Sequence, residues 1–462
     1  MYEKYNAPYV GFWIFFRPAL VIHNPEIVRR VLVKDAAVFK NRLSSSGVND
    51  PMGGLNLFTI NDPPWSSLRR RLTSVFTVAK LRSLFGHMRT KTDELMIRLD
   101  MEMEKHKQIE LRMVFTDYTT DVIGTAAFGV AGDATLTGES PLRTITKQFM
   151  AFTVFRGLSM LSIFFWPEIV DLCGFQMFPR SATDYFRKVY HTIVEQRGGY
   201  DAEITENKDL LDALRKLKQD CERDNEEISE DTLIAQAVAF LQGGFDTTAT
   251  VLSYCVYELA FHPNIQKDPA SFFWTNERVV YYLCQQKKLY NELVDANCVT
   301  DGVIDVGELS NLKYLNSILT EGLRKYANIV WLERVATKDY QIDDKLTISA
   351  GTPVYVNAIG IHYDPKLYPE PSKFDPERFL FDEGDGIKPF TYLPFGDGPR
   401  SCIGRRFALI NLRLALAAIF LKYEVHPLPQ SPKPDDISLE AKSVTFIPGD
   451  PLMVQFVKRK KT

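Results

Sequence analysis

The chain contains 462 residues, of which 45% are hydrophobic and 24% are charged, and its formal net charge is −3. This composition supports a large buried core, and the near balance of charge gives no global case for a nucleic-acid partner. The six cysteines and seven histidines are dispersed without disulfide or zinc spacing, and motifs for metal hydrolysis, phosphoryl transfer and serine nucleophiles are absent, so those classes lose support.

The predicted elements begin with β structure and continue with helices. Residues 9–22 alternate aromatic and aliphatic side chains, as strands do, and a short helix follows Asn24. Helical patterns then cover residues 65–105, 115–128, 184–196 and 208–220. A longer helix begins behind the capping residue Ser229 and runs to about residue 261. Its middle, 233–245, is apolar nearly all round, which indicates a helix inside the protein.

After residue 331 the pattern changes to short strands, at 334–337, 340–342, 345–348 and 353–357, before a last helix that follows Cys402 and ends at about residue 422. No linker or repeat divides the chain. We therefore predict one large fold over residues 1–462, mainly α with a minor β-sheet region. Its parts are mixed β structure at 9–60 and 331–360, a helical core at 65–330, and a cysteine loop with the last long helix at 391–422.

Two segments suit a membrane surface, although no run of 18 apolar residues is present and the apolar patch at 10–16 is too short to cross a bilayer. Residues 161–180 mix aromatic residues with prolines, which suits either the interfacial layer of a membrane or core packing. The basic run 458–461 suits anionic headgroups or an acidic partner, and equally a solvated tail.

The most specific motif is the run 395–404, which has the form F-x-x-G-x-R-x-C-x-G. Average residue usage gives this pattern by chance in roughly one chain of this length in ten thousand. Glycines let the backbone turn sharply and lie close to a flat ligand. A cysteine that opens a helix faces unpaired amides, which favour the thiolate, and such a thiolate suits axial ligation of haem iron.

With this loop the chain resembles a cytochrome P450, a haem-thiolate monooxygenase. The resemblance extends from residue 9 to about residue 457. Within the family, the chain is most similar to animal microsomal, detoxification-type members of insect character. It implies the P450 fold, haem b (iron protoporphyrin IX) as cofactor, and O2 and NADPH-derived electrons as co-substrates. Cys402 would be the iron ligand, in a haem-binding loop that includes Phe395, Gly396 and Gly404.

The long helix carries the run Gly243-Gly244-Phe245-Asp246-Thr247-Thr248. Two glycines inside a helix cost roughly 1 kcal/mol each relative to alanine, and they leave a groove in which dioxygen can lie. The resemblance matches Asp246 and Thr247 to the family's acid–alcohol pair, which delivers protons to oxygen. A loosely packed helix kink with a hydrogen-bonded Asp246 is the alternative interpretation of the same residues.

Further residues receive roles from the resemblance. Trp65, Arg69, Arg334 and Arg400 match the positions that hold the haem propionates, for which the planar guanidinium is well suited. His362 is either a further member of this set or a structural histidine. Glu321 and Arg324, with Arg378 of the run Pro376-Glu377-Arg378-Phe379, are expected to hold the haem-side core together rather than to act in catalysis. The expected substrate walls include Phe240, Gly244, Val330 and Trp331.

The resemblance implies an enzyme that inserts one atom of O2 into an apolar xenobiotic or endogenous lipophilic substrate. Electrons would come from NADPH through NADPH–cytochrome P450 reductase, with cytochrome b5 as a second candidate partner. The expected location is the cytosolic face of the endoplasmic reticulum membrane, in contact with the membrane surface. Two alternatives stay open: a haem-thiolate isomerase without external electrons, and a non-catalytic or misassembled haem binder.

The sequence departs from the family pattern in three places. Members have prolines after the position of Tyr326, where this chain has Ala327 and Asn328, which loosens the end of the preceding helix. Residues 267–286 have no family counterpart, which suggests a retained intron or an assembly error rather than a functional insert. The sequence also begins beyond the N-terminal anchor and hinge of microsomal members, so we expect either that Met1 is not the natural start or that the anchor was lost.

Overall fold

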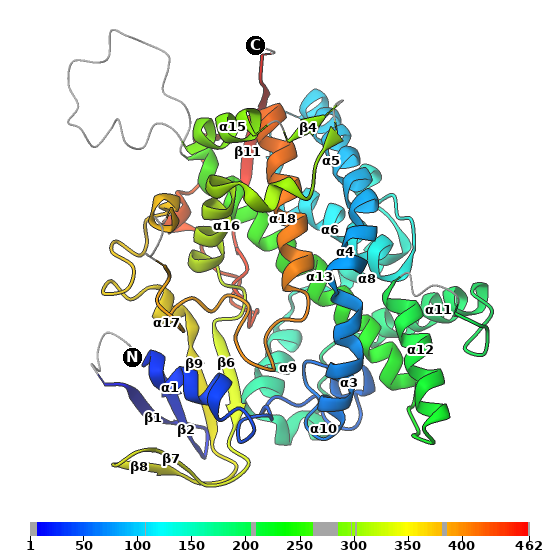
Figure 1. Ribbon diagram of the computed structural model, residues 1–462, viewed down its shortest axis with the longest axis vertical. Coiled ribbons are helices and arrows are strands. Elements are labelled where there is room, and N and C mark those ends of the chain that lie inside the picture. Colours follow the sequence, from blue (N-terminus) through cyan, green and yellow to red (C-terminus); the bar gives the residue numbers. More distant parts are fainter. Residues whose placement is uncertain are drawn as a thin grey trace.

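The computed structural model describes residues 7–106, 108–204, 209–261, 285–296, 298–300, 303–380 and 386–460. It is mainly α-helical with small β-sheets, as the sequence predicts (Figure 1). The expected insert at 267–286 lies outside the described residues, except for Gln285 and Gln286, which begin helix α15 (Gln285–Asp295). Gln286 is buried, and its side-chain amide bonds to the backbone of Leu259 and Val425, so these two residues belong to the fold.

The largest sheet joins the N-terminal hairpin to residues 331–357. Its strand order is β1-β2-β9-β6, with β1 (Tyr9–Ile14), β2 (Arg17–Ile22), β9 (Pro353–Asn357) and β6 (Trp331–Val335). Strands β1 and β2 form an antiparallel hairpin, β2 pairs with β9 in parallel, and β6 pairs with β9 antiparallel. In Figure 1 the blue N-terminal strands therefore lie beside the yellow strands from the second half of the chain. Residues 9–22 are thus one hairpin, and the strand expected at 334–337 begins earlier, at Trp331.

The other strands form smaller sheets: a three-stranded sheet and two two-stranded sheets. The first has the order β10-β11-β3, and the others pair β4 with β5 and β7 with β8. Their bounds are β3 (Ile109–Glu110), β4 (Val299–Thr300), β5 (Val303–Ile304), β7 (Tyr340–Asp343), β8 (Leu346–Ile348), β10 (Tyr423–Pro427) and β11 (Met453–Lys458).

Two long helices define the centre of the molecule. Helix α13 (Glu230–Ala260) begins at Ser229, whose side chain accepts a hydrogen bond from the backbone N–H of Thr232. Most of α13 is buried, and it packs along α6 (Leu111–Phe128), which is also buried over most of its length. Helix α18 (Arg405–Lys422) starts directly after the cysteine loop and also contacts α13. A buried helix surrounded by other helices agrees with the apolar sequence of residues 233–245.

The remaining helices surround this centre. Their bounds are α1 (Pro25–Arg29), η1 (Arg30–Lys34), α2 (Pro51–Gly54), α3 (Pro64–Thr73), η2 (Ser74–Phe76), α4 (Val78–Ser83), α5 (Phe85–Lys105), α7 (Ala134–Thr137), α8 (Pro141–Phe149), α9 (Val154–Phe165), η3 (Pro167–Ile169), α10 (Val170–Cys173), α11 (Arg180–Gln196), α12 (Leu210–Arg223), η5 (Glu308–Asn311), α16 (Lys313–Lys325), α17 (Ala358–His362), η6 (Pro376–Phe379) and η7 (Pro434–Asp436).

The structure divides two stretches that the sequence presents as continuous. The helical pattern at 65–105 is divided into α3, η2, α4 and α5: Thr77 adopts an extended conformation between η2 and α4, and Leu84 separates α4 from α5. The apolar stretch at 161–180 contains the end of α9, then η3 and α10, and the break falls at Trp166–Pro167, since proline cannot continue the preceding helix. In the described part of the chain, no single helix is long and apolar enough to cross a membrane, whereas α8 and α9, bent by 78° at their junction, reach that length together.

Candidate active site

A cavity of about 310 Å3 lies between the middle of α13 and the loop before α18. Its volume is within the usual range of small-molecule sites, roughly 300–1,000 Å3. It brings together most of the residues that the sequence singles out: Trp65, Arg69, Phe240, Gly244, Thr247, Trp331, Arg334, Phe395, Gly396, Arg400, Cys402 and Gly404. Val330 is not among the lining residues, although Ile329 and Trp331 on either side of it are, as alternation along an extended segment requires.

The Cys402 loop is a tight turn that presents a thiol to the cavity. The Cys402 N–H donates to the carbonyl oxygen of Phe395 at 2.8 Å, and the thiol surface is exposed where it lines the cavity. Gly396 and Gly398 have φ angles of 66° and 72°, which L-residues rarely adopt. A Cβ at Gly398 would lie 1.8 Å from the carbonyl oxygen of Leu32, so glycine is required there.

Burial raises the pKa of the Cys402 thiol, while the Gly404 N–H and the charges of Arg69 and Arg405 lower it. The net direction is upward, so the helix start alone does not make Cys402 a thiolate. This differs from the simple sequence argument, because desolvation outweighs the amides and the cations. A coordinated metal ion reverses the balance, since it deprotonates a bound thiol.

The opposite wall of the cavity is the turn of α13 that contains the two glycines. A Cβ at Gly243 would meet nothing within 4 Å, so this glycine leaves open space beside the helix. A Cβ at Gly244 would lie 2.6 Å from Ile123 of α6, so this glycine allows close helix packing. The Thr247 hydroxyl donates to the carbonyl oxygen of Gly243 at 2.7 Å and stays at the cavity wall.

Asp246 points away from the cavity, although it neighbours Thr247 in sequence. Its Oδ1 accepts from Nη2 of Arg112 on α6 at 2.9 Å, and Asp246 is not among the lining residues. Burial raises the pKa of Asp246, and Arg112 lowers it by charge and hydrogen bonding, with a net upward shift. The structure therefore brings Thr247, but not the Asp246 carboxyl, to the cavity.

Four arginines gather at one edge of the cavity, where Glu333 is the one buried carboxylate among the described lining residues. Arg42, Arg69, Arg334 and Arg400 line this edge together with Glu333. The Arg400 guanidinium lies 4.2 Å above the Trp65 ring and donates to the carbonyl oxygens of Lys40 and Ile60. Within the described part of the chain, Arg42 Nε and Arg400 Nη1 are buried without a hydrogen-bond partner.

Burial and the neighbouring positive charges lower the pKa values of Arg334 and Arg400. Burial, followed by the neighbouring Arg42, lowers the pKa of Arg334 to about 9. Burial, Arg42 and Arg334 together lower the pKa of Arg400 to about 8. Lowered arginine pKa values indicate that the site has too little negative charge to balance its guanidinium groups, and two carboxylates of a ligand would supply that charge.

Arg42 and Asn328 line the cavity, although neither was predicted from the sequence as a site residue. Arg42 comes from the segment after η1, and the Asn41–Val335 bridge brings it beside Arg334. Asn328 follows α16, lines the cavity, and donates from Nδ2 to the carbonyl oxygen of Thr247 at 2.9 Å. The signal for Asn328 is a polar side chain where the resemblance predicts a proline; Arg42 carries no motif.

Behind the cavity, Glu321, Arg324 and Arg378 form one buried ion cluster. Arg324 Nε lies 2.6 Å and Arg378 Nε 3.1 Å from carboxylate oxygens of Glu321, and the Glu321 and Arg324 side chains are 0% exposed. His362 does not line the cavity: its Nδ1 lies 3.1 Å from the Arg324 carbonyl, and its Nε2 accepts from the Leu393 N–H at 2.8 Å. The structure thus favours the structural alternative for His362.

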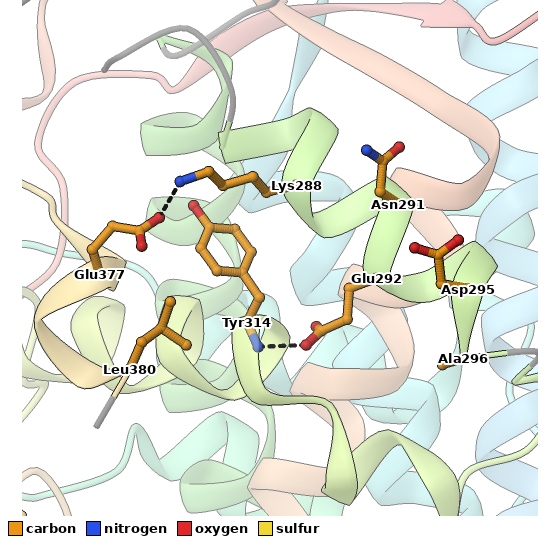
Figure 2. Close-up of a pocket in the computed structure, with 8 residues that line it drawn as sticks. All are labelled: Lys288, Asn291, Glu292, Asp295, Ala296, Tyr314, Glu377 and Leu380. Carbon is orange, nitrogen blue, oxygen red and sulfur yellow. Dashed lines mark hydrogen bonds and ion pairs between the residues drawn. The ribbon is translucent and has the colours of Figure 1, made fainter. Parts of the chain in front are cut away.

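A second hollow, of about 640 Å3, opens at the surface between α15, α16 and η6 (Figure 2). Lys288 reaches Glu377 at 2.6 Å, and the Glu292 carboxylate accepts from the backbone N–H of Tyr314 at 2.7 Å, as the dashed lines show. None of the predicted site residues lines this hollow. The chemistry suggested by the sequence therefore belongs to the first cavity.

Comparison with known proteins identifies the family. The cytochrome P450 family model matches residues 1–268 and 280–454. This chain is a cytochrome P450. Cytochrome P450 6k1 of Blattella germanica is 31% identical over 477 residues, covering 99% of this chain and 86% of that protein. Cytochrome P450 3A25 of Mus musculus is 33% identical over 470 residues, covering 100% and 86%. Probable cytochrome P450 6g2 of Drosophila melanogaster is 30% identical over 449 residues, covering 92% and 81%.

The comparison confirms the predicted family and fold class. As a P450, the chain is a haem b monooxygenase that uses O2 and NADPH-derived electrons, typically through NADPH–cytochrome P450 reductase, and acts on lipophilic substrates. The internal stretch that the family model leaves unmatched, residues 269–279, falls inside the expected insert at 267–286.

The residues present fit haem on two observations. The cationic edge, with its unpaired Arg42 Nε and Arg400 Nη1, suits the two propionate carboxylates of haem. Gly243 on one wall and Gly404 on the other each have open space where a Cβ would stand, which leaves room for a flat ring between α13 and the Cys402 loop.

Proposed function

We propose that this P450 oxidises apolar xenobiotic or endogenous lipophilic molecules inside the 310 Å3 cavity, with Cys402 as the iron ligand. One observation carries the proposal: the Cys402 thiol and the Thr247 turn line the same cavity, whose edge is cationic. When bound, haem activates O2 so that one oxygen atom enters the substrate and the other leaves as water.

The chain would hold haem from three sides. Cys402 would supply the thiolate that binds the iron, and Phe395, Gly396 and Gly404 would supply a backbone that allows a flat ring to lie close to it. The propionates would pair with the guanidinium groups at the cationic edge and with the indole N–H, which come from Arg42, Trp65, Arg69, Arg334 and Arg400. The ion cluster of Glu321, Arg324 and Arg378 would keep the haem-side core in place.

Protons would reach the oxygen side of the cavity along α13. The Thr247 hydroxyl donates its hydrogen to the carbonyl oxygen of Gly243, so the hydroxyl oxygen can accept a hydrogen bond from a donor in the cavity. Asp246, whose pKa is raised by burial, suits a carboxyl that takes up and releases protons. Because its side chain faces Arg112, a side-chain rotation or a water molecule must connect Asp246 to Thr247.

The substrate would lie against apolar walls. Phe240, Gly244 and Trp331 line the cavity, and Phe58, Phe76 and Phe164 add aromatic surface. The Phe76 and Phe240 rings stack with centroids 5.4 Å apart. Apolar walls of this kind exclude water and favour lipophilic molecules.

The membrane surface is the second part of the proposal. The β1–β2 turn meets the end of α9, where the rings of Phe15 and Phe16 lie 4.3 Å and 5.8 Å from the Trp166 ring and Arg17 pairs with Glu168. We call the exposed apolar side chains of β1, the β1–β2 turn, α9 and α10 the apolar rim: Trp13, Phe15, Phe16, Val154, Leu158, Leu161 and Leu172. Aromatic and aliphatic side chains of this kind partition into the membrane interface, which supports contact of the apolar rim with a membrane surface. The location that we propose is the cytosolic face of the endoplasmic reticulum.

Cytochrome b5 is proposed as a second redox partner beside the reductase. Arg405 and Arg406, at the start of α18 directly after the Cys402 loop, are exposed and offer positive charge to an acidic protein. The C-terminal run is less available, because Lys458 pairs with Asp100 and Arg459 with Glu424.

The test uses the purified full chain. We expect the reduced, carbon-monoxide-bound protein to show the absorption band characteristic of thiolate ligation, and Cys402→Ser to lose it. Oxidation of a lipophilic probe should require NADPH and the reductase, which separates a monooxygenase from a haem-thiolate isomerase. An unchanged absorption spectrum in Cys402→Ser would overturn the proposal. Turnover without NADPH would favour the isomerase.

A further inference from the structure

Asn328 links the segment between α16 and β6 to the cavity turn of α13. Its Nδ2 donates to the carbonyl oxygen of Thr247 at 2.9 Å, and its own carbonyl oxygen accepts from the Phe446 N–H at 3.0 Å. The residue is half-buried and lines the cavity. Both ends of Asn328 are therefore fixed, and its side chain has a defined position beside Thr247.

The hydrogen bond to Thr247 also fixes the orientation of the amide. A backbone carbonyl oxygen only accepts, so the NH2 group must face Thr247 and Oδ1 must point elsewhere. Asn328 makes no further side-chain hydrogen bond within the part of the chain that the structure describes. Asn328 lines the cavity, and its Oδ1 is an acceptor without a partner among the described residues.

The setting of this acceptor is apolar. Ile123, Phe240, Val251, Ile329 and Leu332 also line the cavity. The Thr247 hydroxyl hydrogen is already donated to Gly243, so it does not satisfy Asn328 Oδ1. A half-buried acceptor among apolar side chains discriminates strongly between a ligand that brings a donor and one that does not.

We propose that Asn328 is a specificity-determining residue: its Oδ1 accepts a hydrogen bond from a hydroxyl or N–H group on an otherwise apolar substrate. The Nδ2 group of the same residue donates to the carbonyl oxygen of Thr247, so the anchored substrate lies beside the Thr247 turn of α13. The inference deepens the proposed function, because it rests on the substrate occupying this cavity.

The test compares two probes of nearly equal shape, 4-phenylphenol, which carries a donor, and 4-methylbiphenyl, which does not. Dissociation constants are measured by spectral titration of the haem-loaded protein and by calorimetry. We expect the ratio of the two constants, 4-methylbiphenyl over 4-phenylphenol, to fall about threefold to tenfold in Asn328→Leu relative to the unsubstituted protein. Asn311→Leu, the same change at an exposed position on η5, should leave the ratio unchanged.

A ratio that is equal in Asn328→Leu and the unsubstituted protein would overturn the inference. If leucine disturbs folding, as judged by the thermal midpoint, Asn328→Ala, which removes the acceptor without adding bulk, provides the ratio instead. A missing thiolate band in the unsubstituted protein would count against the proposed function alone, since the calorimetric ratio still tests Asn328.

Discussion

Arg112 on α6 and Asp246 on α13 form an ion pair, with Nη2 and Oδ1 2.9 Å apart and both side chains largely buried. Removal of the guanidinium would leave a buried carboxyl without its cation. We expect Arg112→Ala to lower the free energy of unfolding by roughly 3–5 kcal/mol, and Arg112→Lys, which keeps the charge, to recover part of the loss. Urea unfolding measures both, and an alanine variant as stable as the unsubstituted protein would show that the pair contributes nothing.

Thr247→Ala should separate electron use from product formation. Thr247 lines the cavity, and its hydroxyl donates to the carbonyl oxygen of Gly243. We expect NADPH consumption to continue while product yield falls and hydrogen peroxide appears, because proton delivery is impaired. Thr144→Ala is the matched control, since Thr144 is exposed on α8 and makes the same type of bond to the preceding turn. Unchanged coupling in Thr247→Ala would rule out the relay.

The two adjacent glycines of α13 should respond in opposite ways to alanine. A Cβ at Gly243 meets open space, so Gly243→Ala should keep the fold and stabilise the helix by up to about 1 kcal/mol. A Cβ at Gly244 would lie 2.6 Å from Ile123, so Gly244→Ala should force α13 away from α6 and destabilise the protein by about 1–3 kcal/mol. Thermal unfolding of the pair measures both, and equal stabilities would contradict this assignment.

The sequence predicted the long helix α13 and the strands from both ends of the chain because their hydrophobic patterns are local. It also predicted most of the cavity, since the cysteine motif and the ordered family positions carry that information. The direction of Asp246 could not be predicted, because a helix of apolar residues on all sides does not reveal which neighbour supplies a cation. Arg42 was missed for a similar reason: the bridge that brings it to Arg334 joins residues 41 and 335.

Asn328 shows a second limit of the sequence. Its place where the resemblance predicts a proline suggested a looser end to α16, which stays a prediction; α16 ends at Lys325, with Tyr326 as its C-cap. The compensating contact is the hydrogen bond to Thr247, 81 positions away in sequence. Such a contact depends on the packing of α13 against the segment after α16, which no local pattern specifies.

His362 should make stability depend on pH. Burial, and then the charge of Arg324, lower its pKa from 6.5 to about 3, so the folded protein keeps this histidine neutral. Between pH 6.5 and about 3 the unfolded chain binds a proton that the folded chain does not, so this term lowers stability as pH falls, by up to about 1.4 kcal/mol per pH unit. The exposed His87 provides the matched control.

The measurement is the difference in unfolding free energy between the protein and His362→Asn across pH 4–7. A difference is needed because Asp246 and Glu333 act in the opposite sense: burial raises the pKa of each, so the folded state binds their protons more tightly. We expect the pH slope to become shallower in His362→Asn and to stay unchanged in His87→Asn. Equal slopes in all three proteins would contradict a buried neutral His362.

Glu321→Ala should affect haem incorporation through stability alone. Glu321 accepts from Arg324 Nε at 2.6 Å, from Arg378 Nε at 3.1 Å and from the Asp375 N–H at 2.8 Å, and its side chain is 0% exposed. Its loss leaves Arg324 buried without a carboxylate, which should cost roughly 3–5 kcal/mol. We expect a lower unfolding free energy and a lower haem-to-protein ratio after purification.

Two variants separate the charge of Glu321 from its hydrogen bonds and from carboxylate loss in general. Glu321→Gln keeps one acceptor oxygen for Arg324 Nη2 and Arg378 Nε, but it removes the charge and places an NH2 group where an oxygen accepts from Arg324 Nε. An intermediate loss is expected if the ion pairs contribute. Glu308→Ala removes an exposed carboxylate on η5 and should leave both measurements unchanged. Normal haem content in Glu321→Ala would contradict the structural role, because a stranded Arg324 guanidinium has no solvent to compensate it.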